Sequence, residues 1–266
     1  MSSDSLPSAV EEEQSVGLLS NTMEARAEHL KTRNYRSLYY FTTALGVGMM
    51  VMMLTWLVKH RGGFSWSSNT KTQFNWHPLL MSIGMLFIYG HSILVYRTGR
   101  AAPKKRLKIL HALLHGTTFI LAVIALKAVF DSHNYAKPPI ANLYTFHSWF
   151  GLITAILFTG QFLFGFMSFL YPGLSKTLRS AVLPVHVATG TAIFVLALIS
   201  ALTGLTEKTL WTLDTGYAQL PSEAILINFL ALFLGFFGVF VLYLVNDPDF
   251  KRTNLPEDEV ALASSD

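Results

Sequence analysis

Six long apolar stretches dominate the sequence, and they restrict the chain to a fold that crosses a membrane several times. Each stretch is long enough to span about 30 Å of hydrocarbon as a helix rising about 1.5 Å per residue. The 266 residues are 52% hydrophobic and only 14% charged, and a soluble protein of this length would show shorter amphipathic helices. We therefore predict an all-α integral membrane protein with tails at 1–37 and 247–266 and a membrane domain at 38–246. The six predicted transmembrane helices are 38–58, 78–97, 109–130, 147–170, 185–206 and 223–245.

Positive charge predicts the orientation of these helices. Lysine and arginine are concentrated in both tails and in the second and fourth loops, so the positive-inside rule places both termini in the cytosol. No apolar stretch precedes Leu38, so we expect no cleaved signal peptide. A near-dileucine motif ends at Leu18 and Leu19, with its acidic residue one place too far from the leucines. It suggests late endosomes or lysosomes, with secretory vesicles or the plasma membrane as alternatives, and the other reading is a disordered tail without a sorting signal. The cations of the second loop are Arg97, Arg100, Lys104, Lys105, Arg106 and Lys108.

Four histidines lie at the edges of the apolar stretches, one on each of the second to fifth predicted helices. Histidine is costly in hydrocarbon, so such positions indicate function. Because consecutive helices run in opposite directions, His77 and His147 would lie at the outer face, and His111 and His186 at the cytosolic face. A central bundle of these four helices can close both pairs.

The residue types restrict what the two pairs can bind. The chain has no cysteine, which excludes thiolate ligands and disulfides. Two neutral imidazoles on opposite sides of one iron make an electron-transfer haem with no open position, whereas zinc prefers three or four protein ligands. The pattern therefore favours two b haems, one near each face. The alternative is four unrelated buried polar histidines.

Three further histidines are weaker candidates for haem ligands. His91 follows His77 on the same helix, but no second helix offers a matching pair, so we interpret it as a polar satellite. His115 lies one turn after His111 and could hydrogen-bond a haem propionate or a neighbouring helix. His133 ends the third helix, where a lone histidine is usually a solvated loop residue.

Several stretches resemble the cytochrome b-561 family. The resemblance covers residues 40–252 and implies a six-helix homodimer with two b haems. It implies electron transfer from cytosolic ascorbate to monodehydroascorbate or ferric iron across the membrane. The matching stretches are Phe74-Asn75-Trp76-His77-Pro78-Leu79, Leu94-Val95-Tyr96-Arg97, Lys108-Ile109-Leu110-His111, Ala141-Asn142-Leu143-Tyr144, His147-Ser148-Trp149 and Leu202-Thr203-Gly204-Leu205-Thr206-Glu207-Lys208.

The same resemblance implies roles for individual residues. The outer haem would contact His77, His147, Asn142, Leu143, Tyr144, Thr145 and Glu207. The cytosolic haem would contact His111, His186, Arg97 and, on a weaker match, Arg252. Cytosolic ascorbate would bind at Lys104, Lys108 and Arg179, and the outer acceptor at His133, Asn134 and Tyr144. The family's usual Tyr-Ser-Leu before the ligand reads Tyr144-Thr145-Phe146 here, a conservative departure.

The resulting prediction is an ascorbate-dependent transmembrane oxidoreductase, with membrane lipid but no nucleic acid as a partner. We favour ferric iron narrowly as the acceptor, because the Phe74-Asn75-Trp76-His77 form looks most like the iron-reducing branches. Two other classes stay open. One is a haem-containing membrane anchor that passes electrons to a partner protein, and the other is a carrier without haem.

Overall fold

The structure, a computed structural model, describes residues 9–252, and every regular element in that range is a helix. Six of the described helical segments are long and apolar enough to cross a membrane, which confirms the predicted fold class. The second span, from Thr70 to Thr98, is assembled from four consecutive short elements. The elements are α1 (Ala9–Lys59), α2 (Thr70–Gln73), α3 (Trp76–Met81), the π-helix η1 (Ser82–Ile88), α4 (Tyr89–Thr98), α5 (Lys104–Asn134), α6 (Phe146–Phe169), α7 (Lys176–Leu213), the 3₁₀-helix η2 (Asp214–Gln219), α8 (Ser222–Asn246) and the 3₁₀-helix η3 (Pro248–Phe250).

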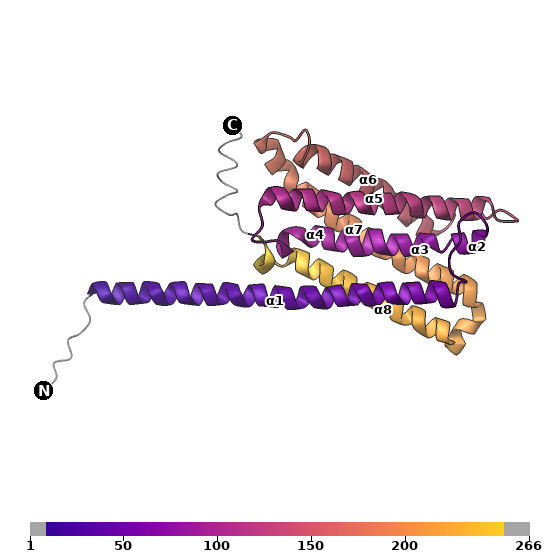
Figure 1. The fold of residues 1–266 in the computed structure, drawn as a ribbon, viewed down its shortest axis with the longest axis horizontal. Helices are drawn as coiled ribbons and strands as arrows, with labels where there is room; N and C mark the ends of the chain where they lie inside the picture. The colour runs from indigo at the N-terminus through magenta and orange to yellow at the C-terminus, as the bar shows by residue number, and fades with distance from the viewer. Residues whose placement is uncertain (1–8, 253–266) are drawn as a thin grey trace.

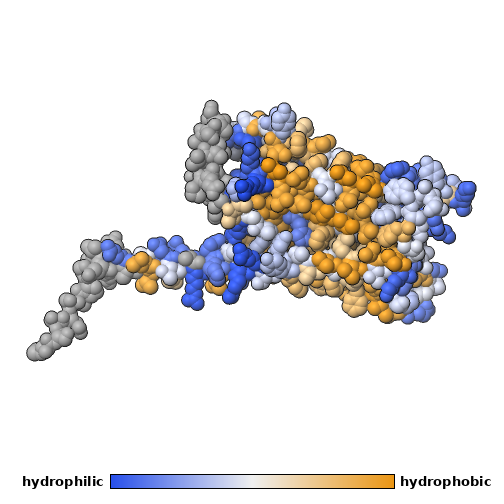
Figure 2. All heavy atoms as spheres, viewed as in Figure 1, coloured by the Kyte–Doolittle hydropathy of each residue, from blue (hydrophilic) through white to orange (hydrophobic). Residues whose placement is uncertain are grey.

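The spans lie roughly parallel, and the molecule has an apolar middle between two polar ends (Figures 1 and 2). Apolar side chains cover the middle of the helices, while hydrophilic residues collect where the loops lie. The beginning of α1 and the end of α8 lie at the same end of the molecule. We call this the terminal end, and the opposite end, which carries the loops 60–69 and 135–145, the far end.

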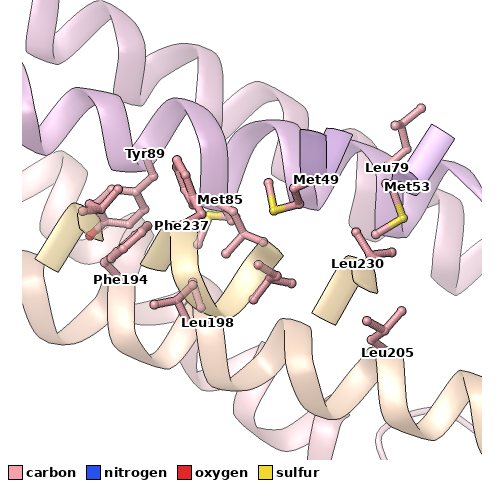
Figure 3. Close-up of a cluster of buried hydrophobic side chains, with 14 of the residues drawn as sticks. Met49, Met53, Leu79, Met85, Tyr89, Phe194, Leu198, Leu205, Leu230 and Phe237 are labelled. Atoms are coloured by element: carbon pink, nitrogen blue, oxygen red, sulfur yellow. The ribbon is translucent and has the colours of Figure 1, made fainter. Parts of the chain in front are cut away.

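The spans form a four-span bundle flanked by a helix pair. The bundle consists of α2–α4, α5, α6 and α7, and α1 and α8 pack along each other beside it (Figure 1). Small residues permit this close contact, as is usual for helices in lipid. A Cβ at Gly46 would lie 2.9 Å from the Phe237 ring, and one at Gly48 would lie 2.6 Å from Phe233. Figure 3 shows Met49 of α1, Phe237 of α8 and Phe194 of α7 in the shared core.

The first helix differs from the prediction. It begins at Ala9 rather than at Leu38, so residues 9–37 of the predicted N-terminal tail are helical. Glutamate, leucine, arginine and lysine, all strong helix formers, are frequent in this segment, and no proline interrupts it. Lys31 also pairs with Asp249 of η3 at 2.9 Å, which ties the helix to the segment that follows α8. Residues 1–8 and 253–266 of the predicted tails lie outside the described residues.

Two other helices begin earlier than predicted. The α7 helix begins at Lys176, capped by the side chain of Ser175, and Pro184 lies within it. Proline removes a backbone donor, which transmembrane helices tolerate because neighbouring groups satisfy the freed carbonyl. The α5 helix begins at Lys104. His111 and His186 therefore lie within helices and do not open them.

The π-helix η1 was not predicted either. Its wider turns carry i→i+5 hydrogen bonds, so the carbonyl of Gly84 accepts from the N–H of Tyr89. The hydroxyl of Thr118 on α5 donates to the carbonyl of Gly84 at 3.2 Å, within the buried interface. Apolar periodicity carries no signal for such a local change of hydrogen-bond register, because η1 is as apolar as the α-helical residues around it.

Candidate functional site

The structure brings the four edge histidines together in the two predicted pairs. His77 lies in the first turn of α3 and His147 in the first turn of α6, and their ring centroids are 6.1 Å apart at the far end. His111 of α5 and His186 of α7 form the second pair, with centroids 6.3 Å apart. This second pair lies toward the terminal end. Each pair joins two different spans, as the alternating helix directions predict.

The separation within each pair fits one metal ion held between two imidazoles. With metal–nitrogen bonds of about 2.0–2.1 Å on opposite sides of an iron, the ring centroids would lie roughly 6 Å apart. No group of three or more His, Cys, Asp or Glu in residues 9–252 could hold a metal ion. The donor set is therefore two isolated imidazole pairs, which suits a haem better than zinc.

Three of the four histidines have the same second contact. Nδ1 of His77 lies 3.3 Å from the carbonyl oxygen of Ala125, Nδ1 of His147 lies 2.8 Å from that of Ser200, and Nδ1 of His111 lies 2.9 Å from that of Ser92. A carbonyl accepts from Nδ1–H, which leaves the lone pair on Nε2 available to a metal.

His186 is held differently, by a side chain. The amide nitrogen of Gln161 on α6 lies 3.0 Å from Nδ1 of His186 and donates to the His186 carbonyl oxygen at 2.6 Å. Gln161 was not predicted as a site residue. A sequence signal did exist, since Gln161 is the only amide side chain in the apolar stretch 147–170.

Two glycines make room for histidines on the facing helix. A Cβ at Gly204 of α7 would lie 2.5 Å from Cε1 of His147 on α6. In the reverse sense, a Cβ at Gly165 of α6 would lie 2.7 Å from Cε1 of His186 on α7. Each helix of the α6–α7 pair thus carries one histidine and the glycine that accommodates its partner's histidine.

A cavity of about 200 Å³ opens beside the far-end pair. His77 and His147 both line it, together with Gly204. Its lining is mostly apolar, as expected for a site that receives a large flat cofactor. The other predicted residues along this cavity are His133, Asn142, Leu143, Tyr144, Thr145 and Glu207.

The predicted acceptor residues are partly connected. Nδ1 of His133 lies 3.1 Å from Oδ1 of Asn142, whose amide donates to Oδ1 of Asn134 at 2.8 Å. Tyr144 does not take part in these hydrogen bonds; its ring stacks on Trp211, with the two ring centroids 6.3 Å apart. Phe74 joins the site from α2's C-terminal side, because its ring stacks on His133 at 6.3 Å and lies 6.1 Å from His77.

The predicted residues of the terminal end fall into two groups. Lys108 is close enough to Lys104 and Arg179 for their charges to act on it, and its Nζ lies 3.4 Å from the carbonyl oxygen of Phe169. Arg97 instead donates to the carbonyl of Asp247, and Arg252 donates to that of Ala102 at 3.1 Å. These two arginines brace the C-terminal segment against the second loop.

The remaining membrane histidines do not join either pair. Nδ1 of His91 lies 2.8 Å from the Phe87 carbonyl oxygen and Nε2 lies 3.1 Å from the Thr43 hydroxyl, so both nitrogens are occupied. His115 is buried with its Nδ1 unpartnered among the described residues. Its ring packs edge-on against His111 at 4.5 Å and Tyr89 at 4.7 Å.

Fold and site together define a multi-pass membrane protein whose helix bundle can hold haem between histidine pairs. Comparison with known proteins leads to a family. The family model for eukaryotic cytochrome b561 matches residues 76–212. The chain belongs to this family, and membership implies haem b as its cofactor.

Named relatives span most of the chain. The transmembrane ascorbate-dependent reductase CYB561 of Sus scrofa is 45% identical over 85% of this chain and 88% of its own length. The lysosomal membrane ascorbate-dependent ferrireductase CYB561A3 of Homo sapiens is 41% identical over 79% of this chain and 87% of its own. The putative transmembrane ascorbate-dependent reductase CYB561 homolog of Caenorhabditis elegans is 38% identical over 80% of this chain and 83% of its own length.

Proposed function

We propose that this protein carries electrons across its membrane, from ascorbate at the terminal end to an acceptor at the far end. The observation that carries the proposal is the pair of two-histidine sites, with ring separations of 6.1 and 6.3 Å, at two levels of one bundle. Two haems b, when bound, would supply one-electron carriers at these two levels. Relatives named ascorbate-dependent reductases support ascorbate as the donor.

The protein's own residues have distinct tasks in this scheme. His77 and His147 would hold one haem and His111 and His186 the other, each through Nε2. For His77, His111 and His147, the backbone carbonyls at Nδ1 fix the ring orientation and make the imidazole a stronger ligand. The apolar lining of the far-end cavity excludes water around the site. Asn142 orients His133 at the edge of that cavity.

At the terminal end, Lys104, Lys108 and Arg179 would bind ascorbate. Ascorbate is a monoanion at neutral pH, and hydrogen bonds from cations to anions are roughly twice as strong as neutral ones. With this end in the cytosol, as the positive-inside rule favours, the electron would leave an inside-negative compartment. That direction is favourable by about 2.3 kcal/mol per 100 mV.

For the acceptor we favour ferric iron over monodehydroascorbate. The lysosomal ferrireductase relative and the near-dileucine motif support an iron-reducing role in an endosomal or lysosomal membrane. The geometry adds a local reason. Because Asn142 Oδ1 accepts from Nδ1–H of His133, Nε2 of His133 retains a lone pair that a ferric chelate can approach.

Haem content and its dependence on single histidines test the proposal. Purified protein should bind two haems b that ascorbate reduces. His77→Ala or His147→Ala should remove only the far-end haem, and His111→Ala or His186→Ala only the other, as measured by pyridine haemochrome content and redox titration. The matched control is His91→Ala, a membrane histidine on the second span with both nitrogens already bonded. Retention of both haems in His111→Ala, with loss in His115→Ala, would move that ligand by one turn.

The two other function classes give different results in the same preparation. A membrane anchor would show haem spectra but would reduce no small acceptor in liposomes without its partner protein. A carrier without haem would show no difference between reduced and oxidised absorption spectra. Either result would rule out a self-sufficient ascorbate-dependent reductase.

A further inference from the structure

Lys208 is a cation at the far-end cavity that the site described so far does not use. It lies one turn after Gly204, the glycine packed against His147, and it lines the cavity next to Glu207. Its Nζ lies 4.2 Å from the centroid of the Phe74 ring. Such a position over an aromatic face stabilises a partly buried ammonium group without neutralising its charge.

The charge of Lys208 is uncompensated by any ion pair within the described residues. Two other cations of this end are paired: Lys127 lies 2.7 Å from an Asp131 oxygen, and Arg61 lies 2.8 Å from a Glu223 oxygen. For Lys208, residues 9–252 provide no carboxylate within 4.0 Å. A partly buried cation without a counter-ion is costly, and a cavity that bears one is suited to an anion.

Phe74 links this cation to the electron-transfer site. The ring that carries Lys208 on its face is also stacked on His133, at an interplanar angle of 8°. The same ring lies 6.1 Å from His77, one of the far-end pair. An anion bound at the Lys208 ammonium group would therefore lie one aromatic ring from a proposed haem ligand.

We propose that Lys208 is the residue that selects an anionic acceptor, with Phe74 as the platform that positions its ammonium group. This inference rests on the proposed electron transfer and adds the charge class of the acceptor. The shared chemistry is an oxyanion that takes one electron per step. A carboxylate-chelated ferric ion becomes ferrous, or the monodehydroascorbate radical anion takes one electron and one proton to become the ascorbate monoanion.

The test compares acceptors of opposite charge. Liposomes that contain the full-length haem-loaded protein are filled with ascorbate and offered ferric citrate, monodehydroascorbate or the cation hexaammineruthenium(III) outside. Lys208→Met should raise KM for the anionic acceptors by about tenfold, because a charge-assisted contact is lost, and should leave or improve KM for the cation. Lys208→Arg should keep the wild-type pattern. A response confined to ferric citrate or to the radical identifies which anion the site takes.

A binding measurement and a control complete the design. Gallium(III) citrate, which cannot be reduced under these conditions, should bind the oxidised wild-type protein and bind Lys208→Met about tenfold more weakly in calorimetry. Lys127→Met removes a cation from the same end that is already paired, and should change nothing. Equal effects of Lys208→Met on anionic and cationic acceptors, or none, would overturn the inference. A wild-type protein that reduces no acceptor would instead overturn the proposed function.

Discussion

At the scale of single residues, the four paired histidines differ in the groups that would fix which nitrogen faces a cofactor. Three of them donate Nδ1–H to backbone carbonyls. A side-chain substitution cannot remove these acceptors, because they belong to the main chain. His186 differs because the amide nitrogen of Gln161 faces its Nδ1. If Nε2 of His186 binds iron, its Nδ1–H has no acceptor in that amide group, and His186 is the weaker donor of the four.

This difference predicts how Gln161 would set the potential of a haem held by His111 and His186. Gln161→Glu places a carboxylate where it can accept from Nδ1–H, which strengthens the imidazole as a ligand and favours ferric iron. We expect the midpoint potential of that haem to fall by an amount on the order of tens of millivolts. Gln161→Leu should change it far less. Potentiometric titration measures both, with the far-end haem as an internal control. A large shift in Gln161→Leu would show that the amide already accepts from His186.

Residue identity alone predicted the four histidines, because a polar ring at the edge of an apolar stretch is conspicuous. It did not predict Lys208 or Phe74 as parts of the proposed acceptor site. Lys208 is the last residue of the family-like stretch Leu202–Lys208. A lysine near the end of a transmembrane helix is ordinarily explained by the membrane boundary. Only the three-dimensional contact with Phe74, far away in the sequence, gives it a chemical role.

At the scale of helices, the α6–α7 pair is built around reciprocal histidine–glycine contacts. His147 lies against Gly204, and His186 lies against Gly165. Each imidazole occupies the space that a side chain would otherwise fill, so the pair can approach closely and still present both rings to the neighbouring span. A glycine at either position is therefore required by packing, independently of its own helix propensity.

Alanine substitution should separate the two sites. Gly204→Ala places a methyl group 2.5 Å from the His147 ring and should reduce far-end haem content, whereas Gly165→Ala should reduce the content of the other haem. Gly160→Ala on α6 is the control for both variants, since no atom of a neighbouring element lies within 4 Å of a Cβ there. It should keep both haems and gain about 1 kcal/mol of helix propensity. Haem quantification after purification decides, and equal loss in all three variants would contradict the packing argument.

Apolar length predicted the existence and order of the spans, since each stretch must cross the same thickness of hydrocarbon. It predicted their ends less well, because helices continue beyond the membrane where polar residues favour them. The α7 helix starts at Lys176 through the Ser175 cap, nine residues before the predicted start at 185, and the sequence break at Pro184 misled the prediction. The prediction placed His186 on the correct helix but at its start, whereas in the structure α7 begins well before His186.

At the scale of the whole molecule, the two ends differ in charge and construction. The far end has the aromatic and amide residues around His133. The terminal end has backbone clamps between the second loop and the C-terminal segment, in which Arg100 donates to the carbonyls of Asp249 and Lys251. The clamps leave Lys104 exposed and Lys108 partly exposed beside Arg179, so these cations stay available to a small anion.

This separation predicts that a donor-site substitution affects reduction by ascorbate and nothing else. Lys108→Ala removes one charge-assisted contact, worth roughly 1.5–3 kcal/mol, so KM for ascorbate should rise about tenfold or more. Reduction by dithionite, both haem spectra and reoxidation by far-end acceptors should stay at wild-type values. Lys105→Ala is the control, because Lys105 is the exposed neighbour of Lys104 on α5. Stopped-flow reduction of the protein measures the effect. If Lys104→Ala, Lys108→Ala and Arg179→Ala combined in one chain left ascorbate kinetics unchanged, the donor would bind elsewhere, although the histidine pairs would still define the electron path.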